Sequence, residues 1–317
     1  MSDAPEADES RSIVKGLIKT IRPHQWVKNL FVLAPMFFDK ELLLSTPAGP
    51  ALNLSVTAHA VAATLVFCLL AGAVYTLNDI VDAAADRIHP VKRHRPIASG
   101  LVPVPLAKVM ATGLIVVSLG VAYFIDVRFA LIALVYLVEN AAYSFKLKKV
   151  AFLDVALISF GFVLRVLAGG FATNVRVSGY MIACTALLAL FLGFGKRRHE
   201  LQLETAGKQR AALEAYSKGS LNVALALTGT ATAATYVAYT LDPTTCEFFH
   251  SSWLWLTAPF TIFGILRFLM LVSGKAGRGR KSESPTQEML RDVPFVLNLV
   301  LWGVVVVAIV YRLRPGT

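Results

Sequence analysis

Residues 56–100 read VTAHAVAATLVFCLLAGAVYTLNDIVDAAADRIHPVKRHRPIASG, an apolar run followed directly by a polar segment that begins at Asn78. The apolar part reaches the roughly 20 residues that a helix needs to cross the hydrocarbon core of a bilayer. The polar part brings three carboxylates, an asparagine and a dense set of cations to one membrane surface. This combination predicts a membrane-spanning helix that ends in a site for a metal-bound diphosphate.

The composition extends this prediction to the whole chain of 317 residues. Hydrophobic residues make up 56% of it and its mean hydropathy is +0.62, whereas soluble proteins of this length show shorter, amphipathic segments. We therefore predict an all-α polytopic membrane protein with nine transmembrane helices. The expected spans are 29–45, 56–77, 105–125, 128–145, 152–172, 178–195, 220–241, 252–273 and 293–312.

The distribution of Lys and Arg orients these spans. With the N-terminus in the cytoplasm, most of the 31 Lys and Arg residues fall on the cytoplasmic side, as the positive-inside rule requires. The opposite side carries only Lys40, Arg128, Arg176, Arg312 and Arg314. We expect a multi-pass protein of the cell (inner or plasma) membrane whose acidic segment faces the cytoplasm. The net charge of +11 then reflects contact with anionic membrane lipids, and no nucleic acid is needed to explain it.

The two ends of the chain differ in character. The first ten residues, MSDAPEADES, are polar and acidic without an apolar core, which predicts a disordered tail over 1–14 and a single transmembrane domain over 15–317. The three cysteines lie far apart and match no metal-ligand spacing. The oligomeric state is not fixed by the sequence, and a homo-oligomer is compatible with it.

Four side chains of the polar segment are spaced to share one face of a helix. At about 100° per residue, Asn78, Asp82 and Asp86 advance by only about 40° at each step, and Asp79 lies within about 60° of Asp82. Neighbouring carboxylates are costly to ionise unless a cation lies between them, and Mg²⁺ prefers oxygen ligands together with substrate phosphates. The alternative is a solvated helix end whose acids pair with the cations that follow. The predicted Mg²⁺ ligands are Asn78, Asp79, Asp82 and Asp86, and the three aspartates are the predicted catalytic residues.

The same segment carries a family resemblance. NDIVDAAADRIHPVKRHRPIASG at 78–100 resembles the first Asp-rich motif of the UbiA-type intramembrane prenyltransferase superfamily, in its histidine, prolines, basic residues and glycine as well as its acids. RPHQWVKN at 22–29 resembles the entry to that family's first helix. The resemblance implies a bundle of nine transmembrane helices around a cavity open to the cytoplasmic side, with a Mg²⁺-dependent site facing the cytoplasm.

A second motif distinguishes between the chemistries of that superfamily. Members that prenylate aromatic rings usually carry a second Asp-rich motif near the end of the sixth helix, but the corresponding segment here, GFGKRRHELQLE at 193–204, has no aspartate. A cationic segment suits a substrate that brings its own negative charge, such as a lipid monophosphate. With YSFKLK at 143–148 and FVLRVLAGG at 162–170, it resembles the decaprenyl-phosphate phosphoribosyltransferase branch.

This second resemblance implies a transferase that moves 5-phosphoribose from phosphoribosyl pyrophosphate to a polyprenyl phosphate of the decaprenyl type, releasing pyrophosphate, in the synthesis of cell-envelope precursors. Two alternatives stay open. One is prenyl transfer from a polyprenyl diphosphate to an aromatic acceptor, as in quinone synthesis, and the other is transport of a phosphorylated metabolite. Transport sites usually lie in interrupted segments near the membrane midplane, whereas these acids lie at one membrane edge.

The predicted substrate-binding residues are polar side chains at this surface or inside a span. They are Lys28, Asn29, Lys92, Arg95, Tyr143, Lys148, Arg165, Lys196, Arg197 and Glu200. Lys92 and Arg95 are placed there because they can bind phosphate oxygens, with Arg95 offering a bidentate fork. Arg165 is included because a charge inside a span normally faces a polar cavity or a partner, and its alternative is a structural pair with a buried acid.

Other members of this set have structural alternatives. Lys28 and Asn29 could anchor an interfacial helix, and Tyr143 and Lys148 could be a belt residue and a topology signal. Glu200 could instead pair with the lysine one helical turn earlier.

Overall fold

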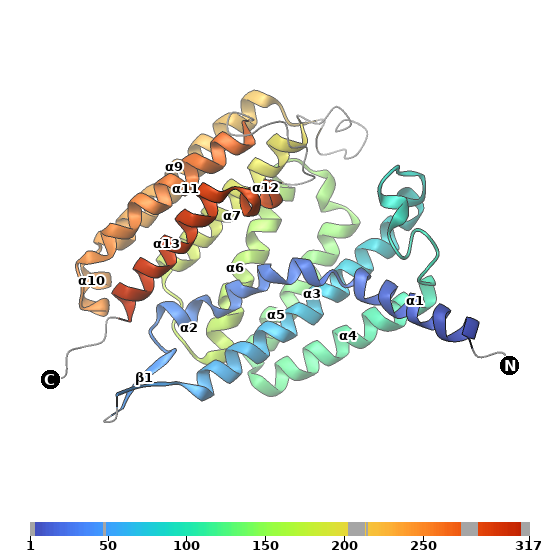
Figure 1. Cartoon of the computed structure of the whole chain (residues 1–317), viewed down its shortest axis with the longest axis horizontal. Coiled ribbons are helices and arrows are strands. Elements are labelled where there is room, and N and C mark those ends of the chain that lie inside the picture. The colour runs from blue at the N-terminus through green and yellow to red at the C-terminus, as the bar shows by residue number, and fades with distance from the viewer. Residues whose placement is uncertain (1–3, 47–48, 202–212, 214, 274–284, 312–317) are drawn as a thin grey trace. The chain divides into compact units, whose positions relative to one another are not determined.

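The computed structural model describes residues 4–46, 49–201, 213, 215–273 and 285–311 (Figure 1). Within these residues, eight helices are long and apolar enough to cross a membrane. The prediction of an all-α polytopic membrane protein is thus confirmed, although nine spans were expected. The chain divides into two compact units, Met1–Leu147 with Leu164–Val177, and Lys148–Val163 with Ser178–Thr317, where the sequence predicts one domain. Helix α6 (Leu153–Thr173) contributes its first half to the second unit and its second half to the first.

The first unit starts with a helical segment that is interrupted and then followed by a hairpin. Its elements are α1 (Ala4–Thr20), the 3-10 helix η1 (Pro23–Leu33), α2 (Ala34–Phe38), β1 (Leu43–Thr46) and β2 (Gly49–Leu52). The two strands are antiparallel, with Leu43 opposite Leu52.

Two predictions for this segment differ from the structure. The span expected over 29–45 is not one long helix, because Pro35 cannot donate a backbone hydrogen bond to the preceding turn and Lys40 has a left-handed backbone with φ 59°. The tail expected to be disordered over 1–14 is helical from Ala4 onward, and its first three residues lie outside the described residues. Helix α1 is anchored where Leu17 packs against the buried cluster that contains Ile97.

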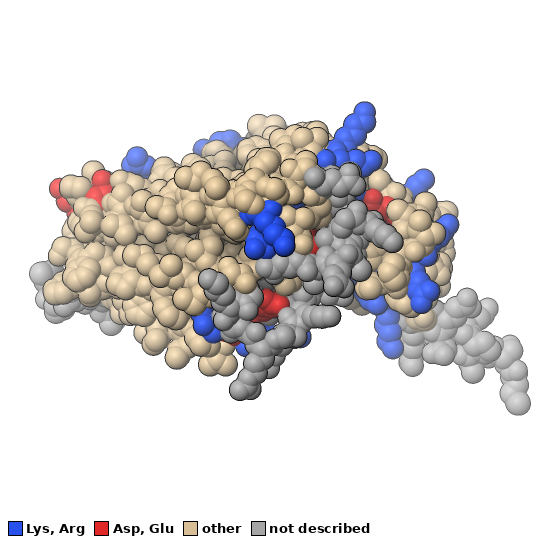
Figure 2. Space-filling model, turned by 90° about the horizontal axis from the view of Figure 1, so that it is seen from above, with Lys and Arg blue, Asp and Glu red and all other residues tan. Residues whose placement is uncertain are grey.

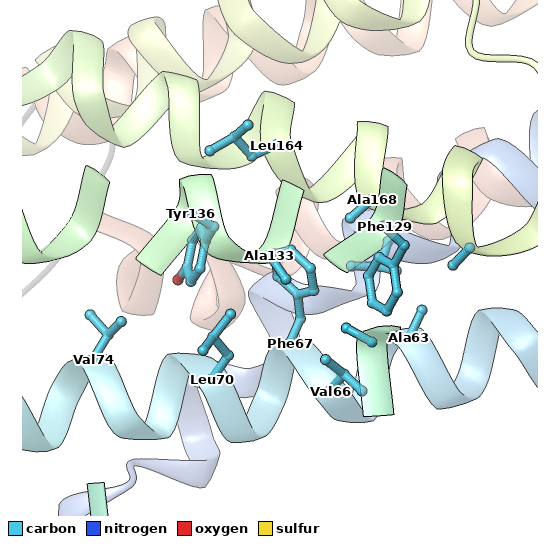
Figure 3. Close-up of a cluster of buried hydrophobic side chains, with 13 residues drawn as sticks. Ala63, Val66, Phe67, Leu70, Val74, Phe129, Ala133, Tyr136, Leu164 and Ala168 are labelled. Carbon is cyan, nitrogen blue, oxygen red and sulfur yellow. The ribbon is translucent and has the colours of Figure 1, made fainter. Parts of the chain in front are cut away.

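Three long helices complete the first unit. They are α3 (Leu54–Ile88), α4 (Val104–Ile125) and α5 (Val127–Phe145). In their shared core, the Phe67 ring of α3 has its centroid 6.0 Å from that of Phe129 and 5.1 Å from that of Tyr136, both on α5 (Figure 3). Leu164 and Ala168 of α6 belong to the same buried cluster. This packing fixes α3 against α5 and the second half of α6.

Helix α3 is much longer than the bilayer requires. Its 35 residues correspond to a length of about 50 Å at 1.5 Å per residue, against a hydrocarbon core of about 30 Å. The predicted span ends at residue 77, but the helix continues beyond it through the polar segment to Ile88.

The second unit contains the first half of α6 and the C-terminal helices. These are α7 (Gly179–Glu200), α9 (Lys218–Leu241), α10 (Pro243–Phe249), the 3-10 helix η5 (Trp253–Thr257), α11 (Ala258–Val272), α12 (Pro285–Arg291) and α13 (Val293–Val310). Helices α9, α11 and α13 lie side by side (Figure 1). Two glycines of α7 permit close helix packing. A β-carbon on Gly193 would lie 2.6 Å from Val155 of α6, and one on Gly195 would lie 2.4 Å from the Phe268 ring of α11.

The outer faces of the helices are apolar. Val109 and Phe124 of α4 and Val300 of α13 are all exposed, and most of the surface seen in Figure 2 carries neither basic nor acidic side chains. Such faces are suited to contact with lipid chains, where a charge would be costly.

Arg267 in α11 is paired with Asp292, the N-cap residue of α13. Its Nε and Nη2 atoms lie 2.9 and 2.8 Å from the two carboxylate oxygens, and the carboxylate also accepts a hydrogen bond from the backbone N–H of Phe295. The Arg267 guanidinium holds the pKa of Asp292 below its usual range. The charge of Arg267 is therefore met by a neighbouring acid within the second unit.

Replacing Arg267 with glutamine is expected to lower the free energy of unfolding by about 1 kcal/mol, because a bidentate ion pair is lost. The full loss in the free energy of unfolding should be seen at neutral pH, where Asp292 is ionised. It should shrink as the pH falls through the lowered pKa of Asp292, because a carboxyl whose pKa is depressed by folding stabilises only while it is ionised. Thermal unfolding in detergent at several pH values checks this. Arg291→Gln removes the exposed neighbouring charge as a control, and an equal loss in that variant would contradict the assignment.

Candidate active site

Helix α3 carries the four predicted metal ligands on its last turns, as the spacing indicates. The carboxylates of Asp79 and Asp86 are buried, with 3% and 5% of their side chains exposed. Asn78 and Asp82 are half-buried. The shared helix is confirmed, and the roles of these residues as metal ligands and catalytic groups stay predictions.

The chain after α3 folds back onto this helix. His89 Nδ1 lies 3.1 Å from the backbone nitrogen of Val91 and 3.2 Å from that of Lys92, which turns the chain into the 3-10 helix η2 (Lys92–His94). Ile97 then packs into a buried cluster with Ala83 of α3. The apolar anchor fixes the position of the basic segment between them.

Arg95, which follows η2, reaches back to both buried acids. Its Nη1 atom lies 2.7 Å from Asp86 Oδ2 and 3.2 Å from Asp79 Oδ1. A single guanidinium therefore bridges carboxylates that lie two helical turns apart. The structure brings this predicted phosphate ligand into direct contact with the predicted metal ligands.

Arg22 is a second cation at Asp79, and the sequence prediction of the site does not include it. Its backbone is left-handed, with φ 51° and ψ 64°, which costs a non-glycine residue about 1 kcal/mol. Its guanidinium donates to Asp79 Oδ1 and lies 5.1 Å from the centroid of the Tyr75 ring. These contacts hold Arg22 in place. The signal that points to it is its position at the start of the segment 22–29, which carries a family resemblance.

The donor set at the end of α3 fits a magnesium ion that arrives with phosphate ligands. Mg²⁺ is usually bound through one or two carboxylates together with substrate phosphates, and Asp79 and Asp86 offer two buried carboxylates. Among the described residues, no group of three or more His, Cys, Asp or Glu side chains could hold a metal ion on its own. An ion at Asp79 would compete with Arg22 and Arg95 for the carboxylate oxygens.

Arg165, in the half of α6 that belongs to the first unit, is buried in a polar network. Its Nε donates to Asn29 Oδ1 and its Nη2 donates to the Tyr136 hydroxyl, each at 2.8 Å. The Asn29 amide donates in turn to Cys68 Sγ at 3.3 Å, and Glu139 on α5 interacts electrostatically with Arg165. Asn29 is thus a buried partner of Arg165 instead of an interfacial anchor. Glu139 was missed, although an acid inside an apolar span is itself a signal.

Helix η1 holds Asn29 in this network by lying against α6. A β-carbon on Gly169 would lie only 1.9 Å from the carbonyl oxygen of Val32. The absence of a side chain at this position lets the η1 backbone approach α6.

Of the remaining predicted ligands outside α7, three lie on elements of the first unit and one lies on an element of the second. Lys28 is half-buried on η1, Lys92 is half-buried on η2, and Tyr143 is half-buried in the last turn of α5. Lys148 lies in the 3-10 helix η3 (Leu147–Lys149) and belongs to the second unit. Their contacts with substrate stay predictions.

The second unit holds a separate buried cluster of charges. The Arg197 side chain of α7 is 1% exposed, and its Nε lies 2.9 Å from Oδ2 of Asp154, which is fully buried. Arg197 Nη1 also donates to Glu200. The Tyr216 hydroxyl donates to Asp154 Oδ1 at 2.7 Å and accepts from the backbone N–H of Phe152 at 2.6 Å. Burial and the neighbouring Asp154 raise the pKa of Tyr216, so this phenol remains a donor.

This cluster bears on the predicted lipid-phosphate contacts at 193–204. The charge of Arg197 is balanced by carboxylates inside the second unit, which favours a structural role over the predicted substrate contact. Glu200 is one of those carboxylates, whereas Lys196 is exposed. Residues 202–204 of the motif lie outside the described residues.

The apolar spans define a polytopic α-helical membrane protein. Its polar site lies near the end of one helix, where buried acids pair with arginines. The chain belongs to the UbiA prenyltransferase family, whose model matches residues 32–289. This confirms the resemblance seen in the sequence.

Individual relatives match over nearly the whole chain. The decaprenyl-phosphate phosphoribosyltransferase of Mycolicibacterium smegmatis is 36% identical over 317 residues, covering 97% of this chain and 96% of that protein. The protein of the same name from Corynebacterium glutamicum is 33% identical, covering 98% and 91%. Among solved structures, a UbiA homolog from Archaeoglobus fulgidus bound to GPP and Mg²⁺ has a TM-score of 0.68 at 18% identity, covering 93% of this chain and 99% of that chain. The last comparison shows a shared fold.

Proposed function

We propose that this chain is a polyprenyl-phosphate phosphoribosyltransferase, which moves 5-phosphoribose from phosphoribosyl pyrophosphate to a polyprenyl phosphate of the decaprenyl type. The observation that carries the proposal is the similarity, at 33–36% identity over nearly the full length, to relatives named decaprenyl-phosphate phosphoribosyltransferase. The carboxylates at the end of α3, with Arg22 and Arg95 in contact with them, suit a diphosphate donor that binds with Mg²⁺, which supports the proposal.

In this proposal, the acceptor phosphate oxygen forms a bond to the anomeric carbon of the ribose. The bond from that carbon to the pyrophosphate oxygen breaks, and its electron pair leaves with pyrophosphate. The acceptor phosphate is already anionic near pH 7, so no strong general base is required. Binding, alignment and neutralisation of charge are the main tasks of the protein.

The residues of the first unit suit these tasks. Mg²⁺ bound through one or two carboxylates of the predicted set Asn78, Asp79, Asp82 and Asp86, together with the donor phosphates, would neutralise the charge that develops on the leaving pyrophosphate. Arg22 and Arg95 already lie at Asp79 and can turn to phosphate oxygens, for which guanidinium groups are well suited. Arg165 is oriented by Asn29 and Tyr136, which supports a substrate-phosphate contact inside the membrane.

The position of the site in the cell is part of the proposal. We place the protein in the cell (inner or plasma) membrane with the acid cluster facing the cytoplasm, because the loops expected on that side are rich in Lys and Arg. Phosphoribosyl pyrophosphate is water-soluble and would reach the acids from that side.

The decisive experiment supplies the purified protein with Mg²⁺, phosphoribosyl pyrophosphate and a long polyprenyl phosphate. Mass spectrometry of the extracted lipid is expected to show a phosphoribosylated polyprenyl phosphate. Asp82→Asn should remove most of this product while the protein remains folded. A parallel reaction with a polyprenyl diphosphate and an aromatic acceptor tests prenyl transfer. Prenylated product there, without phosphoribosylated lipid in the first reaction, would favour the aromatic alternative.

A further inference from the structure

The second unit contains a cavity of about 430 Å³ where three helix ends meet. It lies at the C-terminal ends of α7 and α11 and at the N-terminal end of α9. Its lining residues are Arg198, Asn222, Leu225, Ala226, Leu269 and Ser273. The charged and amide groups thus share one cavity with an apolar wall, and none of these lining residues is acidic.

Arg198 supplies the positive charge of this cavity. Its Nε donates to Asn222 Oδ1 at 3.0 Å, which fixes the guanidinium toward α9. Its Nη1 is buried and has no hydrogen-bond partner among the described residues. A buried donor on a charged group is costly to leave unsatisfied, and the carboxylates of Asp154 and Glu200 are already in contact with Arg197. Within the part of the chain that the structure describes, Arg198 has no carboxylate partner, so its guanidinium can pair with an external anion.

The apolar part of the cavity indicates where that anion comes from. Leu225 and Leu269 form its wall, and beside them Val223, Leu266 and Met270 are exposed on the outer faces of α9 and α11. Exposed apolar side chains of this kind contact lipid chains in a membrane protein. A cation at a helix end beside such a face matches the boundary between lipid head groups and acyl chains.

We infer that this cavity binds the phosphate head group of an anionic membrane phospholipid. The phosphate accepts hydrogen bonds from the Arg198 guanidinium and is within the reach of the Asn222 and Ser273 side chains, and one acyl chain lies along Leu225 and Leu269. This site is separate from the acid cluster of α3 and does not depend on the proposed transfer reaction.

Native mass spectrometry of the detergent-purified full chain tests the inference, with phosphatidylglycerol and phosphatidylcholine of identical acyl chains as probes. Wild type is expected to retain phosphatidylglycerol in preference to phosphatidylcholine. Arg198→Gln should weaken phosphatidylglycerol binding about tenfold or more, since one charge-assisted contact is lost. Ala226→Phe should do the same by filling the cavity while all charges remain.

Lys218→Gln is the matched control, because it removes an exposed charge at the same end of α9 and should leave binding unchanged. Unaltered thermal unfolding of the variants without added lipid shows that they are folded. Equal binding of both lipids by wild type, or full binding by Arg198→Gln and Ala226→Phe, would overturn the inference. Two results would overturn the assignment to a phospholipid. One is that inorganic phosphate competes as effectively as the lipid, and the other is that the protein prefers polyprenyl phosphate to phosphatidylglycerol.

Discussion

Replacing Asp79 with asparagine is expected to reduce phosphoribosyl transfer by at least about 10²- to 10³-fold, the cost of losing one preorganised electrostatic group in an active site. Asp79 is the acid at which the two arginines of the cluster converge, since Arg22 and Arg95 both donate to its Oδ1 atom. The amide of asparagine would leave both guanidinium groups without their shared counter-charge and would weaken the binding of Mg²⁺. Initial rates over a range of Mg²⁺ concentrations measure both effects.

The control for this variant is Asp126→Asn. Asp126 also pairs with an arginine, Arg128, and it caps α5, a function that asparagine can also perform. Its loss removes the same charge from the first unit and should leave transfer nearly unchanged. If Asp79→Asn retains wild-type rates and an unaltered Mg²⁺ dependence, the cluster on α3 is structural and the proposed site is wrong.

Replacing Arg197 with glutamine is expected to destabilise the protein by about 3–5 kcal/mol, the usual cost of removing one partner from a buried ion pair. The reason is the burial of Asp154, whose side chain is 0% exposed and which would keep its carboxylate without the guanidinium that now faces it. Thermal unfolding and the yield of monodisperse protein measure the loss.

A double variant distinguishes a structural role of Arg197 from a substrate contact. Arg197→Met combined with Asp154→Leu removes both charges and should recover much of the stability, because apolar pairs of similar volume can replace buried ion pairs. Lys196→Gln, at the exposed neighbouring position, should unfold like wild type. If Arg197→Gln unfolds like wild type but requires more polyprenyl phosphate for the same rate, the original prediction of a substrate contact is right.

Much of the fold could be predicted from the sequence because a bilayer imposes a simple rule. Long apolar runs must be helices that satisfy their own backbone hydrogen bonds, and Leu54–Ile88, Gly179–Glu200 and Val293–Val310 all follow it. The segment 29–45 was predicted wrongly because its apolar composition does not indicate that the helix is interrupted at Pro35 and that the chain turns at Lys40. Composition alone does not reveal where a chain reverses direction.

The candidate site was predicted where its residues are close in sequence and less well where they are distant. Asp79 and Asp86 share a helix, so spacing alone placed them together. Arg22 lies 57 residues from Asp79, and only tertiary packing brings the two into contact. The same applies to Arg197, since the sequence does not show that its guanidinium pairs with Asp154 in α6.

The close approach of η1 to α6 at Gly169 restricts how this chain can vary. Any other residue there would push against the backbone at Val32, three positions after Asn29, and would displace the amide that holds Arg165. Gly169, which has no functional group of its own, thus determines the orientation of the buried Arg165 guanidinium. At Gly169 even one added methyl group would collide with the carbonyl oxygen of Val32 and misalign the polar centre of the first unit.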